Sequence, residues 1–107
     1  MKKLTLVLVA LAVLLLPCQR AGAADKLTVI LDWFVNPDHA PLYVALEKGF
    51  FKDRGLEVEL IAPSNPSDPA KLVAAGKADI AVSYQHQHQM QVDQGLPLVR
   101  IATLIAT

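Results

Sequence analysis

The pattern of apolar and polar positions predicts four β-strands separated by segments with other periods. One β-rich apolar run ends abruptly at Asp32, and a later run alternates apolar residues with Glu57 and Glu59, as a half-buried strand does. Two further apolar runs follow turn-forming residues. The four expected strands cover residues 27–31, 56–60, 78–82 and 98–106, and the last is expected to be buried.

Helical spacing appears between these expected strands. Tyr43, Leu46 and Phe50 recur three to four positions apart, which predicts a helix that Asp38 caps and Gly49 ends. The other intervals are a turn at residues 52–55, a Pro-rich loop at 63–69, a short helix at 70–75 and a polar segment at 84–94. Strands that alternate with short helices indicate parallel β/α units, so the predicted fold class is α/β in a single domain.

Residues 1–24 have the composition of a secretory signal peptide. Two lysines precede an apolar run over residues 4–16, which as a helix spans roughly 20 Å, short of the ~30 Å hydrocarbon core of a membrane. A proline and several small residues follow, so cleavage is expected after Ala23 or Ala24. The alternative, a buried core helix, seldom has two lysines before it and an Ala-Gly-Ala-Ala segment behind it.

Cys18 directly follows the apolar run, which raises the alternative of a lipid-anchored form. Lipoprotein signals place a small residue before the cysteine, whereas this chain has Pro17, so cleavage after Ala23 or Ala24 without lipidation is favoured. Cleavage would remove three basic residues and leave seven basic against ten acidic side chains. The expected product is periplasmic, comprises residues 25–107 and is mildly acidic.

The composition excludes several classes of function. The chain has 107 residues, of which 53% are hydrophobic, and ten basic side chains balance ten acidic ones. A disordered tail combines low hydrophobicity with high net charge, and a nucleic-acid binder needs a stripe of lysine or arginine. A single cysteine can form neither an internal disulfide nor a cysteine-based zinc site.

The histidines do not predict a metal site or a catalytic centre. His86 and His88 are two positions apart, so on a helix they point about 200° away from each other and cannot share one ion. His39 beside Asp38 could act as a general base, although a histidine at a helix start is more often a cap or a hydrogen-bond donor to a ligand. Neither a nucleophile pattern nor a Gly-rich phosphate loop stands out in the sequence.

Candidate ligand-binding side chains follow the expected strands, because ligands of open α/β sheets bind at the carboxyl ends of the strands. Trp33 is expected to stack on a flat ligand, whereas Phe34 should point the other way; the alternative is that one ring covers the end of the sheet. Neutral hydrogen-bonding groups in these loops, which are also ordinary turn formers and caps, are Asn36, Ser64, Asn65 and Ser83.

Five short stretches together resemble one known family of exported proteins. They are residues 31–34 (LDWF), 36–43 (NPDHAPLY), 49–52 (GFFK), 55–56 (GL) and 76–80 (GKADI). The chain is similar to the substrate-binding proteins of ABC transporters, in the branch that binds thiamine pyrimidine precursors such as hydroxymethylpyrimidine or formylaminopyrimidine. That branch is related to the fungal thiamine-pyrimidine synthases.

The resemblance implies a type II periplasmic-binding-protein fold, in which two doubly wound α/β lobes close on a ligand. Residues 25–107 would form the N-terminal part of one lobe, with the second lobe absent, and the pattern indeed stops directly after the last expected strand. The implied partners are a pyrimidine precursor and the membrane permease of the transporter, and the implied state is a monomer without cofactor. Carried over by position, the ligand-binding residues are Trp33, Asn36, His39 and Tyr84, with Asp32 and Ser83 as neighbours.

Two alternatives stay open at this point. The synthases are enzymes, but they have a cofactor-binding lysine where this chain has Ser83 and a histidine where it has Gln87, and without the lysine no Schiff base can form. Sulfonate- and nitrate-binding relatives share the architecture and hold anions at helix N-termini. Trp33 and Tyr84 favour a flat heterocycle over a small anion. Because the lysine is missing, we expect a binding protein rather than an enzyme.

Overall fold

The computed structural model describes residues 22–106. Most of the expected signal peptide therefore lies outside the described residues, and residues 22–24 are exposed and without regular structure. Among the helices of the described part, none is long and apolar enough to cross a membrane.

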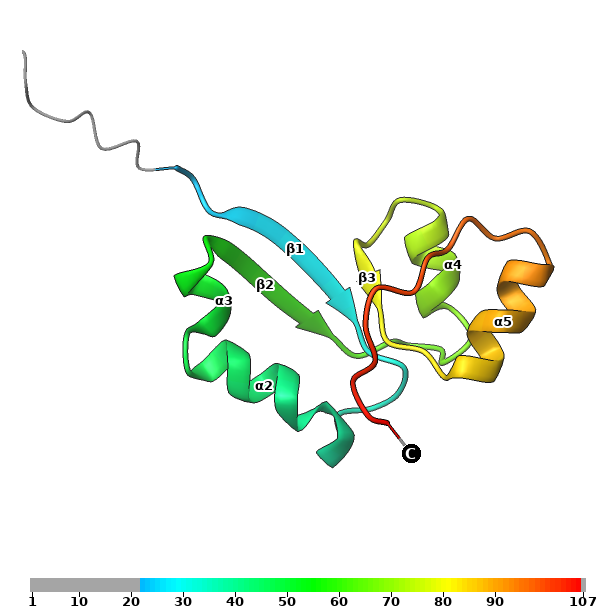
Figure 1. Cartoon of the computed structure of the whole chain (residues 1–107), viewed down its shortest axis with the longest axis horizontal. Coiled ribbons are helices and arrows are strands. Elements are labelled where there is room, and N and C mark those ends of the chain that lie inside the picture. Colours follow the sequence, from blue (N-terminus) through cyan, green and yellow to red (C-terminus); the bar gives the residue numbers. More distant parts are fainter. Residues whose placement is uncertain (1–21, 107) are drawn as a thin grey trace, which may run out of the picture.

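A three-stranded parallel sheet in the order β2-β1-β3 organises the described residues (Figure 1). The strands are β1 (Asp25–Ile30), β2 (Leu56–Ile61) and β3 (Ile80–Ala81). The central strand, β1, pairs along its whole length with β2, whereas β3 pairs with just its last two residues, Val29 and Ile30. The predicted α/β class with a parallel sheet is confirmed.

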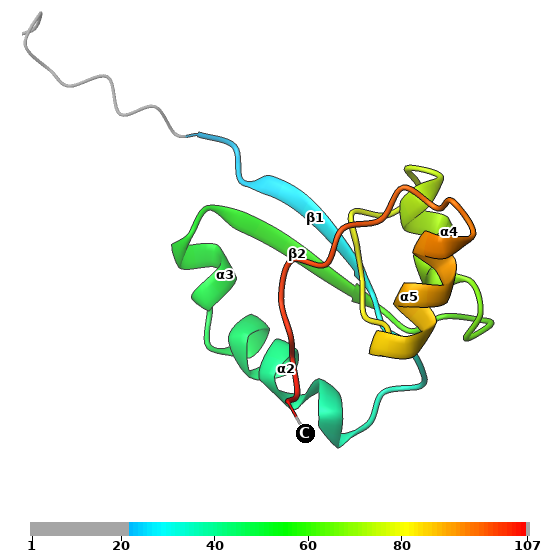
Figure 2. The ribbon, with the colours of Figure 1, turned by 45° about the vertical axis from the view of Figure 1, so that its right-hand side comes forward.

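Short helices connect the strands. Between β1 and β2 lie a 3₁₀ turn η1 (Pro37–His39) and the helices α2 (Ala40–Glu47) and α3 (Phe50–Asp53). Helix α4 (Pro69–Ala74) joins β2 to β3, and α5 (Gln85–Asp93) follows β3. Figures 1 and 2 show α2 and α3 running alongside β2, while α4 and α5 lie beside β3 at the other side of the sheet.

The core of the described residues is small and centred on the carboxyl end of β1. Burial increases along this strand, from exposed Asp25 to buried Ile30, and Leu31 just beyond it is fully buried. The other buried apolar side chains are Val29, Val58, Ala70 and Ala78, together with the prolines Pro63 and Pro69. The best-packed part of the protein therefore lies directly beneath the loop that follows β1, and it holds the start of that loop in place.

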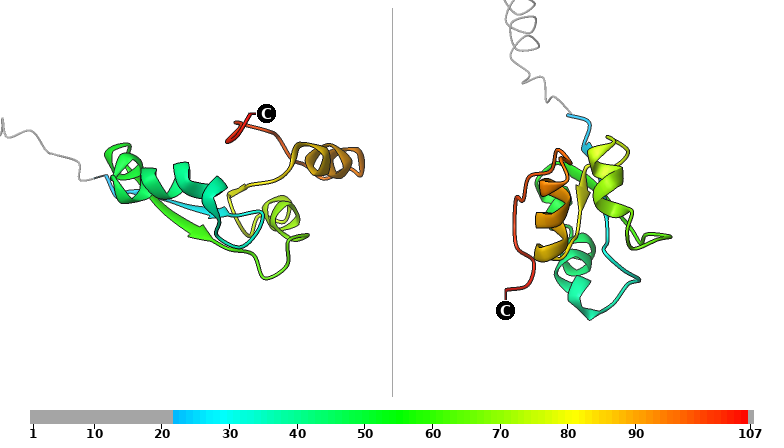
Figure 3. Two further views of the ribbon diagram at one scale, coloured as in Figure 1. Left: turned by 90° about the horizontal axis from the view of Figure 1, so that it is seen from below. Right: turned by 90° about the vertical axis from the view of Figure 1, so that its right-hand side faces the viewer.

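The prediction of a buried strand at residues 98–106 is wrong. The structure shows no regular element there, and Val99 and Ile101 are 85% and 73% exposed. Figure 3 shows the segment after α5 running along the outside of the molecule. A strand needs backbone partners and a layer that covers its apolar face, and within residues 22–106 this segment has neither.

Several predicted boundaries also change. Asp38 does not cap the first helix: a 3₁₀ turn capped by Asn36 precedes α2, and His39 stands at the N-cap position of α2 without a side-chain cap bond. The expected turn at residues 52–55 begins inside α3 and ends at Gly55, which has a φ of 73°. The expected strand at 78–82 contracts to Ile80–Ala81, although the backbone N–H groups of Asp79 and Val82 on either side still donate to Thr28 and Ile30 of β1. Gly49, with a φ of 77°, follows α2 in the left-handed conformation that the sequence predicted.

Candidate functional site

The site lies where the sheet changes its direction of growth. Strand β2 is added on one side of β1 and β3 on the other, so the loops after β1 and β3 diverge at the carboxyl ends of two adjacent strands. Ligands of open α/β sheets bind at such points. An open hollow of about 440 Å³ is present here, and it is lined by Asp32, Trp33, Asn36, Pro66, Tyr84, His86, Gln87 and Met90.

A buried histidine supports the carboxylate of this hollow. His39 is 1% exposed, and its Nε2 lies 2.6 Å from Oδ1 of Asp32, which is 12% exposed. The other ring nitrogen, Nδ1, accepts the backbone N–H of Asn36 at 3.3 Å. Because Nδ1 is an acceptor, the imidazole proton is on Nε2, and Nε2 donates to Asp32.

The local sequence explains why His39 occupies this position. The Asn36 side-chain oxygen accepts a hydrogen bond from the backbone N–H of Asp38 at 2.9 Å, and the backbone N–H of Asn36 in turn donates to Nδ1 of His39. This reciprocal arrangement is a capping box, with histidine in the place of the usual glutamate or glutamine, and Pro37 begins the turn. The cap thus directs the histidine ring inward, toward the start of its own loop.

Hydrogen bonding determines the charge of Asp32. Partial burial acts to raise the pKa of this carboxyl group, but hydrogen bonds from His39, from the Asp32 backbone and from Tyr84 outweigh it, and the pKa is lowered. The same contact raises the pKa of the Tyr84 phenol, because the neighbouring carboxylate disfavours loss of its proton. At neutral pH the hollow therefore contains a carboxylate that can only accept hydrogen bonds.

Aromatic rings flank this carboxylate. Trp33 is 48% exposed and lines the hollow, whereas Phe34 does not line it and contacts Trp33 edge-on, with 5.6 Å between ring centroids. Tyr84 lines the hollow from the opposite loop and stacks on His86 at 5.9 Å. Exposed rings on both sides of a hollow form a surface that suits a flat ligand.

The candidate residues from the sequence divide into three groups. Asp32, Trp33, Asn36 and Tyr84 line the hollow. His39 lies behind it rather than on its surface. Ser83 and Asn65 are occupied locally: Ser83 Oγ donates to Oε1 of Gln87 at 3.3 Å, and Asn65 Oδ1 accepts from both the backbone and the hydroxyl of Ser67, as a turn former does.

Four lining residues, Pro66, His86, Gln87 and Met90, were not among the sequence candidates. The last three belong to α5, which begins directly after β3 and presents its first turns to the hollow. Gln87 and Met90 are three positions apart, so on a helix they lie on the same face, and this spacing was the one feature of the sequence that could have indicated their shared position. Their role was not predicted from the sequence, because a glutamine- and histidine-rich helix has the composition of a solvated surface.

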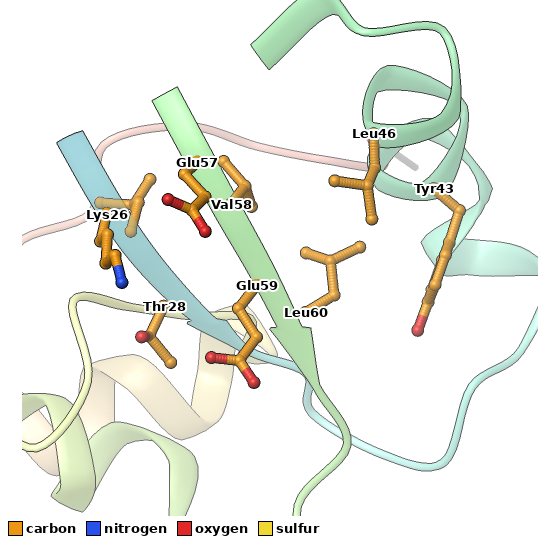
Figure 4. Close-up of a pocket in the computed structure, with 9 residues that line it drawn as sticks. Lys26, Thr28, Tyr43, Leu46, Glu57, Val58, Glu59 and Leu60 are labelled. Carbon is orange, nitrogen blue, oxygen red and sulfur yellow. The ribbon is translucent and has the colours of Figure 1, made fainter. Parts of the chain in front are cut away.

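A second hollow, of about 490 Å³, lies along the middle of β1 and β2 (Figure 4). Figure 4 shows charged strand residues, Lys26 and Glu57 among them, and the side chains of Leu60 and of Leu46 from α2, which point toward each other. Lys26 and Glu57 are register neighbours and exposed, which is typical of a solvated sheet face. Nowhere in residues 22–106 do three potential metal ligands come together.

Comparison with known proteins identifies the family. The family model described as NMT1/THI5 like matches residues 36–107. The chain belongs to the NMT1/THI5-like family. The predicted resemblance is thereby confirmed, and the match includes the Asn36 cap, His39 and the whole β3–α5 part of the site.

Curated relatives of this NMT1/THI5-like chain include one named as a binding protein and several named as synthases. It is 56% identical over 84 residues, 78% of the chain, to a protein of Haemophilus influenzae named for thiamine biosynthesis. It is 38% identical over 111 residues, 98% of the chain, to the formylaminopyrimidine-binding protein of Halalkalibacterium halodurans. A 4-amino-5-hydroxymethyl-2-methylpyrimidine phosphate synthase of Saccharomyces cerevisiae is 34% identical over 83 residues, 78% of the chain. The chain spans 27%, 34% and 24% of the lengths of these three relatives.

Proposed function

We propose that this chain contributes the first-lobe half of a site that binds a thiamine pyrimidine precursor, such as hydroxymethylpyrimidine or formylaminopyrimidine. The observation that carries the proposal is the Asp32 carboxylate, held at the wall of a hollow between Trp33 and Tyr84. The name of the Halalkalibacterium halodurans relative and the family membership support the same ligand class.

The chemistry of the hollow fits an amino-substituted pyrimidine. The ring of such a ligand is flat and aromatic, so the exposed faces of Trp33 and Tyr84 can stack on it. Its amino group offers N–H donors, and the Asp32 carboxylate is an acceptor. The Asn36 side chain, which binds the backbone of Phe34 and Asp38, shapes the rim.

The charge of the hollow disfavours the anion-binding alternative. Among the described residues that line it there is one carboxylate, Asp32, and there is neither lysine nor arginine. A sulfonate or nitrate bound in the hollow would lie near that carboxylate without a lysine or arginine to compensate, and the repulsion between the two negative charges is unfavourable. A neutral heterocycle with N–H donors avoids this repulsion.

A binding role is proposed in preference to the synthase activity named for the yeast relative. Where the synthases have a cofactor-binding lysine, this chain has Ser83, whose hydroxyl donates a hydrogen bond to Gln87. Ser83 cannot form a Schiff base. We place the protein in the periplasm as a monomeric component of an ABC importer that delivers its ligand to a membrane permease, with residues 1–24 as the cleaved signal. In this proposal residues 25–107 belong to a periplasmic-binding-protein lobe.

The experiment is a calorimetric titration with hydroxymethylpyrimidine, formylaminopyrimidine and taurine. It is done with the chain itself and with a chimera in which the matched residues replace the corresponding segment of the Haemophilus influenzae relative, to which they are 56% identical. We expect the chimera to bind a pyrimidine and to ignore taurine. Preference for taurine, or a folded chimera that binds neither pyrimidine, would contradict the proposal.

A further inference from the structure

We propose that His39 is a positioning residue, which does not touch the ligand but holds the Asp32 carboxylate at the wall of the hollow in one orientation. This inference rests on the proposed function for its ligand. It assigns ligand contact to Asp32 and support of Asp32 to His39, whereas the sequence predicted that His39 itself contacts the ligand.

Burial separates His39 from the ligand. The side chain is 1% exposed and does not line the hollow, while Asp32, Trp33 and Asn36 of the same loop do. A polar ring this deeply buried needs partners for both nitrogens. It has them in Asn36 N–H at 3.3 Å and Asp32 Oδ1 at 2.6 Å, so no ring nitrogen is left for a ligand.

The two hydrogen bonds of the ring have different consequences. The bond at Nδ1 belongs to the capping box, which determines the turn between β1 and α2. The bond at Nε2 is short and charge-assisted, and it restrains the rotation of the Asp32 side chain. Tyr84, from the loop after β3, lines the same hollow as this carboxyl group and helps to lower its pKa.

Restraint of this carboxylate has a functional meaning. A carboxylate fixed in place receives an N–H donor at lower entropic cost than one that rotates freely. It also rejects a ligand that presents an oxygen at the same point, since two acceptors then face each other. His39 therefore acts on ligand selectivity, for a 4-amino over a 4-oxo pyrimidine, through Asp32.

Two substitutions divide the roles of the ring. The amide of glutamine reaches the region of Nε2, so His39→Gln keeps a donor to Asp32 and loses the acceptor for Asn36 N–H. The amide of asparagine reaches the region of Nδ1, so His39→Asn keeps the cap acceptor and loses the donor to Asp32. The pair is matched in chemistry and differs by one methylene.

The experiment measures the affinity of the chimera and both variants for 4-amino-5-hydroxymethyl-2-methylpyrimidine and its 4-oxo analogue, together with thermal midpoints. We expect His39→Asn to lose about tenfold or more in affinity for the amino compound and most of its selectivity. We expect His39→Gln to keep the selectivity although its midpoint falls. The opposite pattern, with selectivity kept by Asn and lost by Gln, would show that the ring serves the cap alone and overturn the inference.

A measurement on the unaltered chimera makes the test independent of how the variants fold. The ¹⁵N spectrum of the His39 imidazole should show the proton on Nε2 and a bare Nδ1. A proton on Nδ1 would overturn the inference whether or not the variants bind ligand. If the imidazole has the expected proton but no pyrimidine binds, the proposed function fails and the support of Asp32 by His39 stands.

Discussion

Removing the indole ring of Trp33 should weaken pyrimidine binding without unfolding the protein. Trp33→Ala deletes a side chain that lines the hollow, in a residue that is 48% exposed, so much of its surface is available to a ligand rather than packed against the protein. Stacking of a base on an aromatic side chain is worth about 1–3 kcal/mol in nucleic-acid complexes, used here as an analogy. At about 1.4 kcal/mol per factor of ten, the loss of affinity is between about fivefold and a hundredfold.

The same structure indicates that the variant will fold. The Trp33 ring packs edge-on against Phe34, with 5.6 Å between ring centroids, and such a contact is worth about 0.5–1.5 kcal/mol. Asp32 and His39, which hold the loop together, keep their mutual hydrogen bond in Trp33→Ala. A modest fall of the thermal midpoint should therefore accompany a larger fall of affinity.

Calorimetric titration of the chimera with hydroxymethylpyrimidine, and a thermal melt of each variant, test this expectation. Phe34→Ala is the near control, since that ring touches Trp33 but does not line the hollow, and it should lose less affinity than Trp33→Ala. Phe50→Ala is the distant control, because Phe50 is similarly exposed but lies on α3, and its affinity should not change. Unchanged affinity in a folded Trp33→Ala protein would refute the stacking role.

Three further outcomes are expected. The pKa of Asp32 is lowered in the folded protein, so its contribution to stability is present above its ordinary pKa of 3.8 and is lost as the pH falls through the lower, folded-state value. Asp32→Asn should therefore weaken the decrease of the urea midpoint between about pH 5 and 2. The control variant, Asp93→Asn at an exposed position, should not have this effect. Gly49→Ala places a side chain at a φ of 77° and should lower the free energy of unfolding by about 1–2 kcal/mol in urea titration, with a smaller loss for Gly49→Asn; equal loss for both would contradict the backbone argument. The exported protein should begin at residue 24 or 25, and an intact mass that retains the first residues or shows lipid on cysteine would exclude this cleavage.

The sequence predicted those parts of the fold that depend on local patterns. The alternation of Leu56, Val58 and Leu60 with glutamates predicted β2, and its central valine is indeed buried. The apolar segment at 98–106 misled the prediction, because composition reports a tendency to be buried but not whether another element covers the residues. The short β3 has the same cause, since strand length depends on the neighbouring strand as well as on the segment itself.

The candidate site was predictable in its chemistry and less so in its geometry. Trp33 and Tyr84 were expected at the carboxyl ends of strands, and the structure places both at one hollow. The inward position of His39 could not be foreseen without knowing that Asn36, rather than Asp38, caps the turn. With the cap two residues earlier than expected, the ring of His39 faces the Asp32 carboxylate.

The two halves of the site depend on different parts of the fold, and this separates the effects of substitutions. Residues 32–39 organise themselves through hydrogen bonds that span at most seven positions, so their arrangement follows from local sequence. Tyr84 meets Asp32 through the pairing of β3 with the last two residues of β1, a contact across about 50 positions of chain. Changes in the short β3 pairing should therefore move Tyr84 away from the hollow while the Asp32–His39 pair stays intact. Affinity would then fall although the histidine tautomer is unchanged, which separates a defect of sheet pairing from a defect of the capped loop.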